Sequence, residues 1–175
     1  MDAKSRRERF ADLLSDHKNI LYKVCSAYCR NPADRDDLAQ EIAIQLWRSF
    51  GSFDDRYRFS TWMYRVSINV AISFYRREAN RARHVLSGDD RLIEIPDRVE
   101  RPPEDVLLLY QFIDGLDALN KALILLSLDG YGYREIAGVV GISETNVATK
   151  LSRLKQAMKR DLAGAVRQEK DAETT

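Results

Sequence analysis

The chain has 175 residues, of which 45% are hydrophobic and 31% are charged. This composition is typical of a folded globular protein and excludes a disordered chain, and the length allows one ordinary domain or two small ones. No apolar run approaches the roughly 20 residues that a membrane-spanning helix needs, and the charged, amphipathic start does not resemble a signal peptide. We therefore expect a cytoplasmic protein without membrane insertion.

The formal net charge of +1 conceals an uneven distribution of charge along the chain. Residues 1–83 hold 16 Lys and Arg against 11 Asp and Glu, a net charge of +5. Residues 84–104 have a net charge of −3, and residues 105–175 have one of −1. A basic first segment followed by an acidic connector indicates a contact with nucleic acid that the chain itself partly screens.

Eight Gly and four Pro leave few obstacles to long helices, so the sequence predicts an all-α protein. Apolar residues recur at helical spacing over residues 10–28, in a stripe that can break near Asp16. Asn31 is then the expected N-cap, and Pro32 the first residue, of a second helix that ends at Gly51.

A polar loop over residues 51–58 precedes a third helix, which Ser60 is expected to cap and which runs through Arg77 to about Arg83. The core-facing side of this helix is predicted from its regularly spaced apolar residues, which are Phe59, Met63, Val66, Val70 and Phe74. Three helices with apolar stripes can close one small core.

Helical periodicity disappears over residues 84–104, a stretch that contains three prolines and two adjacent aspartates. About 21 residues are too long for a loop inside a compact domain. The sequence therefore predicts two small helical domains joined by an extended acidic linker. The first is a three-to-four-helix domain over residues 1–83, and the second is a helix-turn-helix domain over residues 105–175 whose polar tail frays from Gly164 onward.

Residues 132–162 have the pattern of a helix-turn-helix, in which Gly141 and Ile142 form a tight turn and Ser143 caps the next helix. The inward positions are apolar residues at spacings of three and four, namely Ile136, Ala137, Val140, Val147, Leu151, Leu154, Met158 and Leu162. The outward positions of the second helix are polar or basic residues that suit a major groove and its phosphates, namely Thr145, Asn146, Thr149, Lys150, Arg153 and Lys155. A solvated face on a packing domain is the alternative, but the agreement of turn, cap and stripe favours DNA binding.

The second expected helix has two contrasting sides over residues 34–50. One side is apolar, and the other mixes carboxylates, amides and an isoleucine, namely Asp37, Gln40, Glu41, Ile44, Gln45 and Arg48. This mixture suits a protein partner better than phosphate, although an ordinary solvated face has the same spacing.

The helix after the polar loop combines aromatic and basic side chains over residues 59–78. Its outer face is predicted to carry Trp62, Arg65, Asn69, Ser73 and Arg76, with Tyr64 and Tyr75 nearby. Rings stack on unpaired bases, guanidinium groups hold the backbone, and an amide hydrogen-bonds an exposed base edge, so this pattern indicates single-stranded nucleic acid. Burial of Trp62 in the core is equally compatible with the sequence.

Cys25 and Cys29 are the two cysteines of the chain, four residues apart on an expected helix. They are either half of a metal site completed by His17 or His84, or two buried thiols that behave as small hydrophobic residues. Cysteine pairs in zinc sites usually have closer spacing and a second pair elsewhere, so the sequence favours buried thiols and no metal.

A second alternative is that the chain is an enzyme. Four acidic residues resemble the cluster of a metal-dependent nuclease, namely Asp34, Asp36, Asp37 and Glu41. Carboxylates at a helix N-terminus are explained equally well by the helix dipole. The sequence has no paired second cluster and no phosphate-binding loop, so we expect no catalytic activity and no cofactor.

Residues 33–78 resemble the second conserved region of extracytoplasmic-function (ECF) sigma factors. The resemblance lies in the pattern D-L-A-Q-E-(x5)-W, in the stretch F-S-T-W-M-Y-R-V, and in Asn69 four residues after Arg65. Residues 116–162 resemble the fourth conserved region of the same family, in the expected order and separation.

The resemblance implies a partner for each surface. Clamp helices of the largest subunit of core RNA polymerase would bind Asp37, Gln40, Glu41, Ile44 and Arg48. The minus-ten element of promoter DNA, as its strands separate, would bind Phe53, Arg56, Arg58, Trp62, Tyr64, Arg65, Asn69 and Arg76. The helix-turn-helix residues named above would bind the minus-thirty-five element, and the flap of the second subunit is a further partner. An anti-sigma factor is a usual partner in the family, although no residue here identifies one.

Two departures from the family pattern bear on the second domain. Gly132 occupies a cap position where the family usually has Ser or Thr, so fraying of the next helix is expected. Ala148 stands where a basic residue is common, which removes one expected phosphate contact. A free-standing helix-turn-helix regulator that binds DNA as a dimer is the main alternative, but no heptad stretch long enough for a dimer interface is present.

Overall fold

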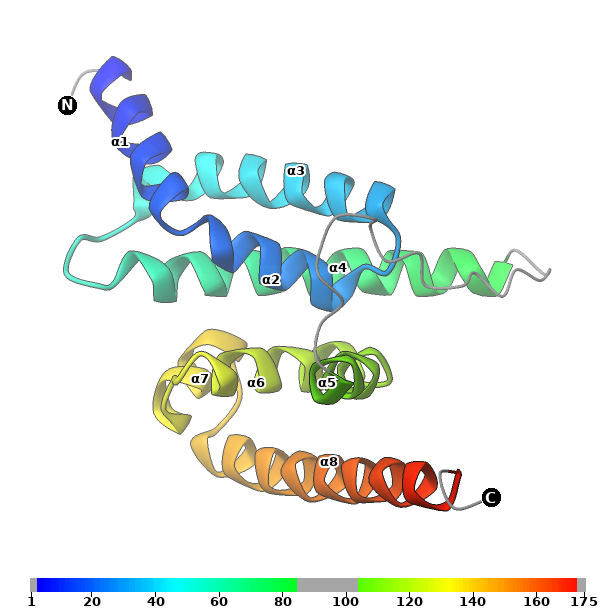
Figure 1. Cartoon of the computed structure of the whole chain (residues 1–175). Helices are drawn as coiled ribbons and strands as arrows, with labels where there is room; N and C mark the ends of the chain where they lie inside the picture. The colour runs from blue at the N-terminus through cyan, green and yellow to red at the C-terminus, as the bar shows by residue number, and fades with distance from the viewer. Residues whose placement is uncertain (1–2, 85–103, 173–175) are drawn as a thin grey trace. The chain divides into compact units, whose positions relative to one another are not determined.

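The computed structural model describes residues 3–84 and 104–172, and the chain divides into two compact units, residues 1–94 and 95–175 (Figure 1). The regular structure in these ranges is helical, which confirms the predicted all-α class with two helical units. Most of the predicted linker lies outside the described residues. Its predicted end points are helical, since His84 ends one helix and Glu104 begins another.

The described part of the N-terminal unit consists of α1 (Ala3–Asp16), α2 (Lys18–Tyr28), α3 (Pro32–Ser49), the 3-10 turn η1 (Phe50–Ser52) and α4 (Phe59–His84). The expected break in the first apolar stripe is confirmed, because α1 and α2 are separated at His17. There the ring Nδ1 of His17 lies 2.9 Å from the carbonyl oxygen of Leu13.

The start of α3 follows the sequence prediction closely. The side-chain oxygen of Asn31 accepts a hydrogen bond from the backbone N–H of Asp34 at 2.7 Å, and Pro32 occupies the first helical position. The helix ends two residues before Gly51, and the chain continues through Phe50–Ser52 as a 3-10 turn.

The start of α4 differs from the prediction. Ser60 is not the cap, because the helix begins at Phe59 and the carbonyl of Arg58 already accepts hydrogen bonds from the N–H groups of Thr61 and Trp62. The side chain of an N-cap residue accepts a hydrogen bond from a free backbone N–H group of the first turn. Ser60 lies inside that turn, so it does not occupy the cap position.

The core of the N-terminal unit lies between α2, α3 and α4. Its fully buried side chains include Val24, Leu38, Ile42, Leu46, Met63 and Ile68. Burial of each such aliphatic side chain stabilises the fold by roughly 1.5–3 kcal/mol. Helix α1 adds Phe10, which is buried against the rings of Trp47 and Phe50.

The buried face of α4 is rotated from the predicted one. Phe59, Met63 and Phe74 are buried as expected, but Val66 and Val70 are only half-buried. Among the side chains of this helix that the structure describes, the other buried ones are Tyr64, Ser67, Ile68 and Ala71. Because α4 packs against both α2 and α3, its buried face is wider than one stripe and its phase is set by both neighbours.

The described part of the C-terminal unit consists of α5 (Glu104–Asp114), α6 (Ala118–Leu128), α7 (Tyr133–Val140) and α8 (Glu144–Ala172). Gly141 has a φ of +75°, a left-handed conformation that favours glycine, and it ends α7 as the sequence predicted. Ser143 caps α8 by accepting a hydrogen bond from the N–H of Asn146 at 3.2 Å.

Two predictions for this unit were wrong. The tail is helical to Ala172 rather than frayed from Gly164, because its residues are mostly good helix formers such as Ala, Arg, Gln, Glu and Lys. In α7, Val139 is buried beside Ile136, whereas Ala137 and Val140 are half-buried. Of the other inward positions with described side chains, Val147, Leu151 and Leu154 are buried as predicted, whereas Met158 is half-buried.

A lysine is buried in the core of the C-terminal unit. Lys121 on α6 is 3% exposed, and its ammonium group lies 3.9 Å from a carboxylate oxygen of Asp114 at the end of α5. This ion pair offsets part of the free-energy cost of removing the lysine charge from water. Neither stretch 3–84 nor stretch 104–172 contains a helix long and apolar enough to span a membrane.

The cap of α3 yields a test of the N-terminal unit. Asn31→Ala should lower its free energy of unfolding by about 1 kcal/mol, because the N–H of Asp34 loses its acceptor. Urea denaturation followed by tryptophan fluorescence measures this unit selectively, since both tryptophans, Trp47 and Trp62, lie in it. Asn19→Ala, an exposed substitution on α2, is the matched control. Equal stability of the two variants would contradict the assigned cap.

Candidate functional surfaces

The outer face of α3 presents the side chains that the sequence assigned to a protein partner. Asp37, Gln40 and Arg48 are exposed, Ile44 is 51% exposed, and Glu41 is partly exposed. Ile44 is therefore an exposed apolar side chain among the polar groups of this helix face.

Glu41 on α3 forms an ion pair with Arg77 on α4. Nη2 of Arg77 donates to both carboxylate oxygens of Glu41, at 2.6 and 2.7 Å. This hydrogen bonding raises the pKa of the Arg77 guanidinium above its ordinary value. No local sequence pattern indicates a role for Arg77, because its partner lies 36 residues away along the chain.

An open groove of about 610 Å³ runs between α3 and α4. From α3 it is lined by Glu41, Ile44, Gln45, Arg48 and Ser49, and from α4 by Val66, Asn69, Val70, Ser73 and Arg77. This α3–α4 groove brings three residues assigned to the polymerase, Glu41, Ile44 and Arg48, beside Asn69, which was assigned to DNA. Val66 and Val70, predicted to be core residues, instead line it.

Four aromatic rings cluster where η1, the following loop and α4 meet. Phe53 lies 5.2 Å from Trp62 and 5.4 Å from Phe59 between ring centroids, and it stacks on Phe50 at 6.2 Å with an angle of 13° between the planes. Phe50 and Phe59 are buried, whereas Phe53 and Trp62 are half-buried. The half-buried pair therefore offers accessible ring surface held in place by the buried pair.

The loop over residues 52–58 is ordered by its own charges. The Asp54 carboxylate accepts hydrogen bonds from the backbone N–H of Arg56 at 3.0 Å and from Nη2 of Arg56 at 2.6 Å. These hydrogen bonds hold the pKa of Asp54 below its ordinary value. Nη2 of Arg9 on α1 forms an ion pair with Asp55, and Arg58 is exposed.

Tyr64 was wrongly assigned to the minus-ten surface. Its side chain is 1% exposed, because α4 turns this position toward the core. Arg65, Asn69 and Arg76 are exposed, in contrast, and follow Trp62 along one face of the same helix.

In the C-terminal unit, the outward face of α8 matches the predicted one. The side chains of Thr145, Asn146, Thr149, Arg153 and Lys155 are exposed, and that of Lys150 is half-buried. The start of α7 does not depend on a serine or threonine cap, since the carboxylate of Glu135 accepts a hydrogen bond from the N–H of Gly132 at 2.9 Å. This contact supplies one half of a capping box and opposes the fraying expected at Gly132.

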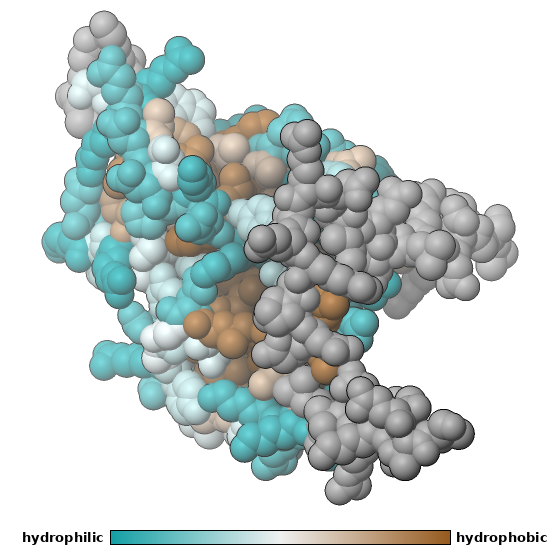
Figure 2. All heavy atoms as spheres, in the orientation of Figure 1, coloured by the Kyte–Doolittle hydropathy of each residue, from teal (hydrophilic) through white to brown (hydrophobic). Residues whose placement is uncertain are grey.

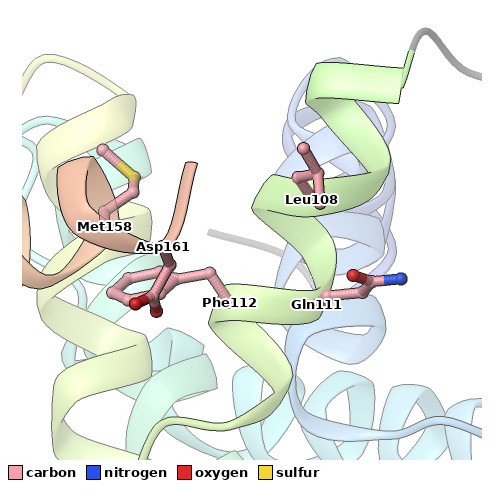
Figure 3. Close-up of a pocket in the computed structure, with 5 residues that line it drawn as sticks. All are labelled: Leu108, Gln111, Phe112, Met158 and Asp161. Carbon is pink, nitrogen blue, oxygen red and sulfur yellow. The ribbon is translucent and has the colours of Figure 1, made fainter. Parts of the chain in front are cut away.

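A smaller pocket of about 270 Å³ lies between α5 and α8 (Figure 3). Leu108, Gln111 and Phe112 line it from α5, and Met158 and Asp161 from α8. Figure 3 shows the ring of Phe112 extending toward Asp161 and Met158, whereas the amide of Gln111 points away. Its lining therefore combines three apolar side chains with one amide and one carboxylate.

Comparison with known proteins identifies the two halves of the chain. Residues 13–81 match the model of Sigma-70 region 2, and residues 107–158 match that of Sigma-70, region 4. The chain is 25% identical to the ECF RNA polymerase sigma factor SigW of Bacillus subtilis, over 91% of each chain. It is 28% identical to the RNA polymerase sigma-H factor of Pseudomonas aeruginosa, over 93% of this chain and 90% of that one.

The chain belongs to the ECF family of RNA polymerase sigma factors. Two solved structures share its fold. The sigma factor RpoE of Bartonella quintana, in complex with the anti-sigma factor NepR, has a TM-score of 0.66 at 17% identity, with 92% of this chain and 98% of that chain covered. CnrH in complex with the cytosolic domain of CnrY has a TM-score of 0.64 at 21% identity, with 90% of both chains covered.

Region 2 of this sigma factor contains all of α2 and α3 and most of α4, and region 4 contains the helix-turn-helix. The presence of both regions in one chain does not favour the free-standing regulator. Two of the four acidic residues of the nuclease alternative have other partners, since Asp34 hydrogen-bonds Asn31 and Glu41 pairs with Arg77. In the described ranges, no three His, Cys, Asp or Glu side chains lie close enough together to hold a metal ion.

Cys25 and Cys29 are buried free thiols in this sigma factor. Burial is the main cause that raises the pKa of Cys25 from 9.0 to about 11 and that of Cys29 to about 12. Folding therefore favours the neutral thiols, and the stability that depends on them is lost as the pH rises above 9.0 toward the raised pKa values.

The raised pKa values predict unreactive thiols. At pH 8 and in native buffer, both cysteines should react with Ellman's reagent at least about 100-fold more slowly than glutathione, because the thiolate fraction falls about tenfold for each unit of pKa. Both should react at once in guanidinium chloride. Rapid reaction of either thiol in the native protein would contradict the assigned burial.

Proposed function

We propose that this sigma factor binds core RNA polymerase and promoter DNA through three surfaces distributed over its two units. It selects promoters and assists strand opening, does no chemistry of its own, and works in the cytoplasm where the polymerase acts. The observation that carries the proposal is the α3–α4 groove, because its two walls belong to the two surfaces that must work side by side in region 2.

The polymerase-binding surface is the outer face of α3. Asp37, Gln40, Arg48 and the exposed Ile44 lie on this face, with Glu41 at its edge beside Arg77. A central apolar side chain within a ring of polar groups is the usual arrangement of a protein interface. We assign it to the clamp helices of the largest subunit.

The minus-ten surface comprises the 52–58 loop and the adjoining exposed face of α4. Phe53 and Trp62 supply rings for stacking, and Arg65 and Arg76 supply charge for the phosphate backbone. Asn69, exposed in the groove, can hydrogen-bond the edge of an unpaired base. Arg56 and Arg58 extend the same surface into the loop.

The third surface is the outward face of α8, which we assign to the minus-thirty-five element. Thr145, Asn146 and Thr149 lie in the first turns of the helix, where a helix-turn-helix contacts base edges, and Lys150, Arg153 and Lys155 follow as phosphate contacts. We propose that the C-terminal unit, to which α8 belongs, also binds the flap of the second polymerase subunit.

We also propose that an anti-sigma factor controls this protein. The support is that one solved structure with this fold holds the sigma factor RpoE in complex with the anti-sigma factor NepR, and another holds CnrH in complex with the cytosolic domain of CnrY.

The direct test is a pull-down of purified core polymerase by the tagged chain, followed by run-off transcription from promoter-bearing genomic fragments. We expect a stable complex and transcripts that depend on the added chain. No association with core polymerase would end the proposal.

Asp37→Ala should weaken binding to core polymerase about tenfold, because the polymerase group that pairs with this carboxylate in the assigned interface loses its partner. Asp36→Ala removes the same charge from a neighbouring exposed position outside the assigned set and is the matched control. Fluorescence anisotropy of labelled chain gives both affinities, and unchanged urea denaturation shows that both variants fold. Equal affinities of the two variants for core polymerase would show that the polymerase does not bind this face of α3.

Lys150→Ala and Arg153→Ala should each weaken holoenzyme binding to promoter duplex and lower the slope of log affinity against log salt by about 1. Lys18→Ala, an exposed charge on α2, is the control that should leave the slope unchanged. Binding measured over a series of salt concentrations separates the two outcomes. An unaltered slope in both α8 variants would show that the assigned helix face is wrong.

A further inference from the structure

Helix α1 contacts the part of region 2 that carries the 52–58 loop. Phe10 packs edge-to-face on Trp47 and Phe50, at centroid distances of 5.2 and 5.1 Å. The guanidinium of Arg6 lies 5.1 Å above the ring of Trp47, and that of Arg9 lies 5.9 Å above the ring of Phe50. Figure 2 shows mostly hydrophilic residues over the visible side of α1.

Gly51 makes room for this contact. A Cβ atom at Gly51 would lie 3.1 Å from Nη2 of Arg6, a distance tighter than most real contacts. The absence of a side chain therefore lets the arginine of α1 approach the backbone of the 3-10 turn directly.

Asp55 links the 52–58 loop to α1. Within the loop, Asp54 pairs with Arg56, and the N–H of Tyr57 donates to the carbonyl of Asp54 at 3.0 Å, so these contacts are local. The carboxylate of Asp55 instead forms an ion pair with Arg9, which lies 46 residues earlier. A connection between elements restricts the loop more than contacts within it, because it removes motion of the loop as a whole.

We propose that Arg9 is a positioning residue for recognition of the minus-ten element. It holds Asp55, and through it the segment with Phe53 and Arg56, in one arrangement against the aromatic cluster. The inference rests on the proposed role of this loop in contacting the melted strand. It assigns α1, which carries none of the residues expected from sequence to bind DNA, a part in promoter selectivity.

The test uses holoenzyme reconstituted with the wild-type chain, Arg9→Gln, Asp55→Asn and the charge reversal Arg9→Asp with Asp55→Arg. Arg7→Gln, an exposed arginine on the same helix, is the matched control. Open-complex yield is measured by permanganate reactivity on promoters that carry each single-base change in the minus-ten element. The ratio of yields between the preferred base and the next gives the selectivity.

Arg9→Gln and Asp55→Asn should each lower this selectivity about two- to fivefold, in line with the coupling of one exposed ion pair. The charge reversal should restore most of it, and Arg7→Gln should leave it unchanged. Core affinity should stay constant in all variants. The effect should shrink at high salt, which screens an exposed pair.

Wild-type selectivity in both single variants would overturn the inference. If Arg9 contacts DNA phosphate directly, Asp55→Asn will keep full selectivity and the reversal will not rescue it, which also overturns it. Should Arg9→Gln detach α1 and destabilise region 2, Asp55→Asn at the exposed loop still decides the question. A wild-type chain that opens no promoter with core polymerase would instead contradict the proposed function itself.

Discussion

The packing of α4 against both α2 and α3 is the constraint on which region 2 depends. Burial of Met63, Ile68 and Phe74 fixes the rotation of the helix about its axis. Once that rotation is set, the positions of Arg65 and Asn69 on the outer surface follow, because side chains on a helix keep their angular spacing. The same rotation leaves Val66 and Val70 in the wall of the α3–α4 groove. The position of each candidate DNA contact on this helix is thus a consequence of core packing.

Three carboxylates on or beside the functional surfaces are paired within the protein. Glu41 is held by Arg77, Asp54 by Arg56, and Asp55 by Arg9. A partner must exchange these contacts for its own, so the net gain from each charged group is small. Such surfaces contribute more to the choice of partner and to the geometry of binding than to affinity alone. The accessible aromatic rings and Ile44 are then the groups from which binding energy is expected.

Much of the fold follows from local sequence signals. The cap at Asn31, the left-handed turn at Gly141 and the cap at Ser143 are each fixed by one residue and its neighbours, and all three predictions were confirmed. The outer face of α8 was also correct, since its inward apolar residues keep one clear helical period. These features need no knowledge of distant parts of the chain.

The predictions that were wrong or missing concern features that are determined by contacts between distant parts of the chain. Apolar residues occur on several sides of α4, so its periodicity alone allowed two phases, and Tyr64 was placed on the wrong side. The pairs Glu41–Arg77 and Arg9–Asp55 join residues 36 and 46 positions apart, and no local sequence pattern predicts them. Arg6, Arg9 and Phe10 do share one side of α1, at spacings of three and four. That spacing was a signal for a contact surface, although not for its partner.

The central claim is that one chain holds duplex DNA with one unit and strand-separated DNA with the other while bound to the polymerase. Footprinting on a single promoter, with core polymerase in the presence and absence of the chain, tests it most directly. We expect protection of the duplex near minus thirty-five together with permanganate-reactive thymines near minus ten, both only when chain and core are present. A full footprint by the chain alone, or upstream protection without any opening downstream, would contradict the account.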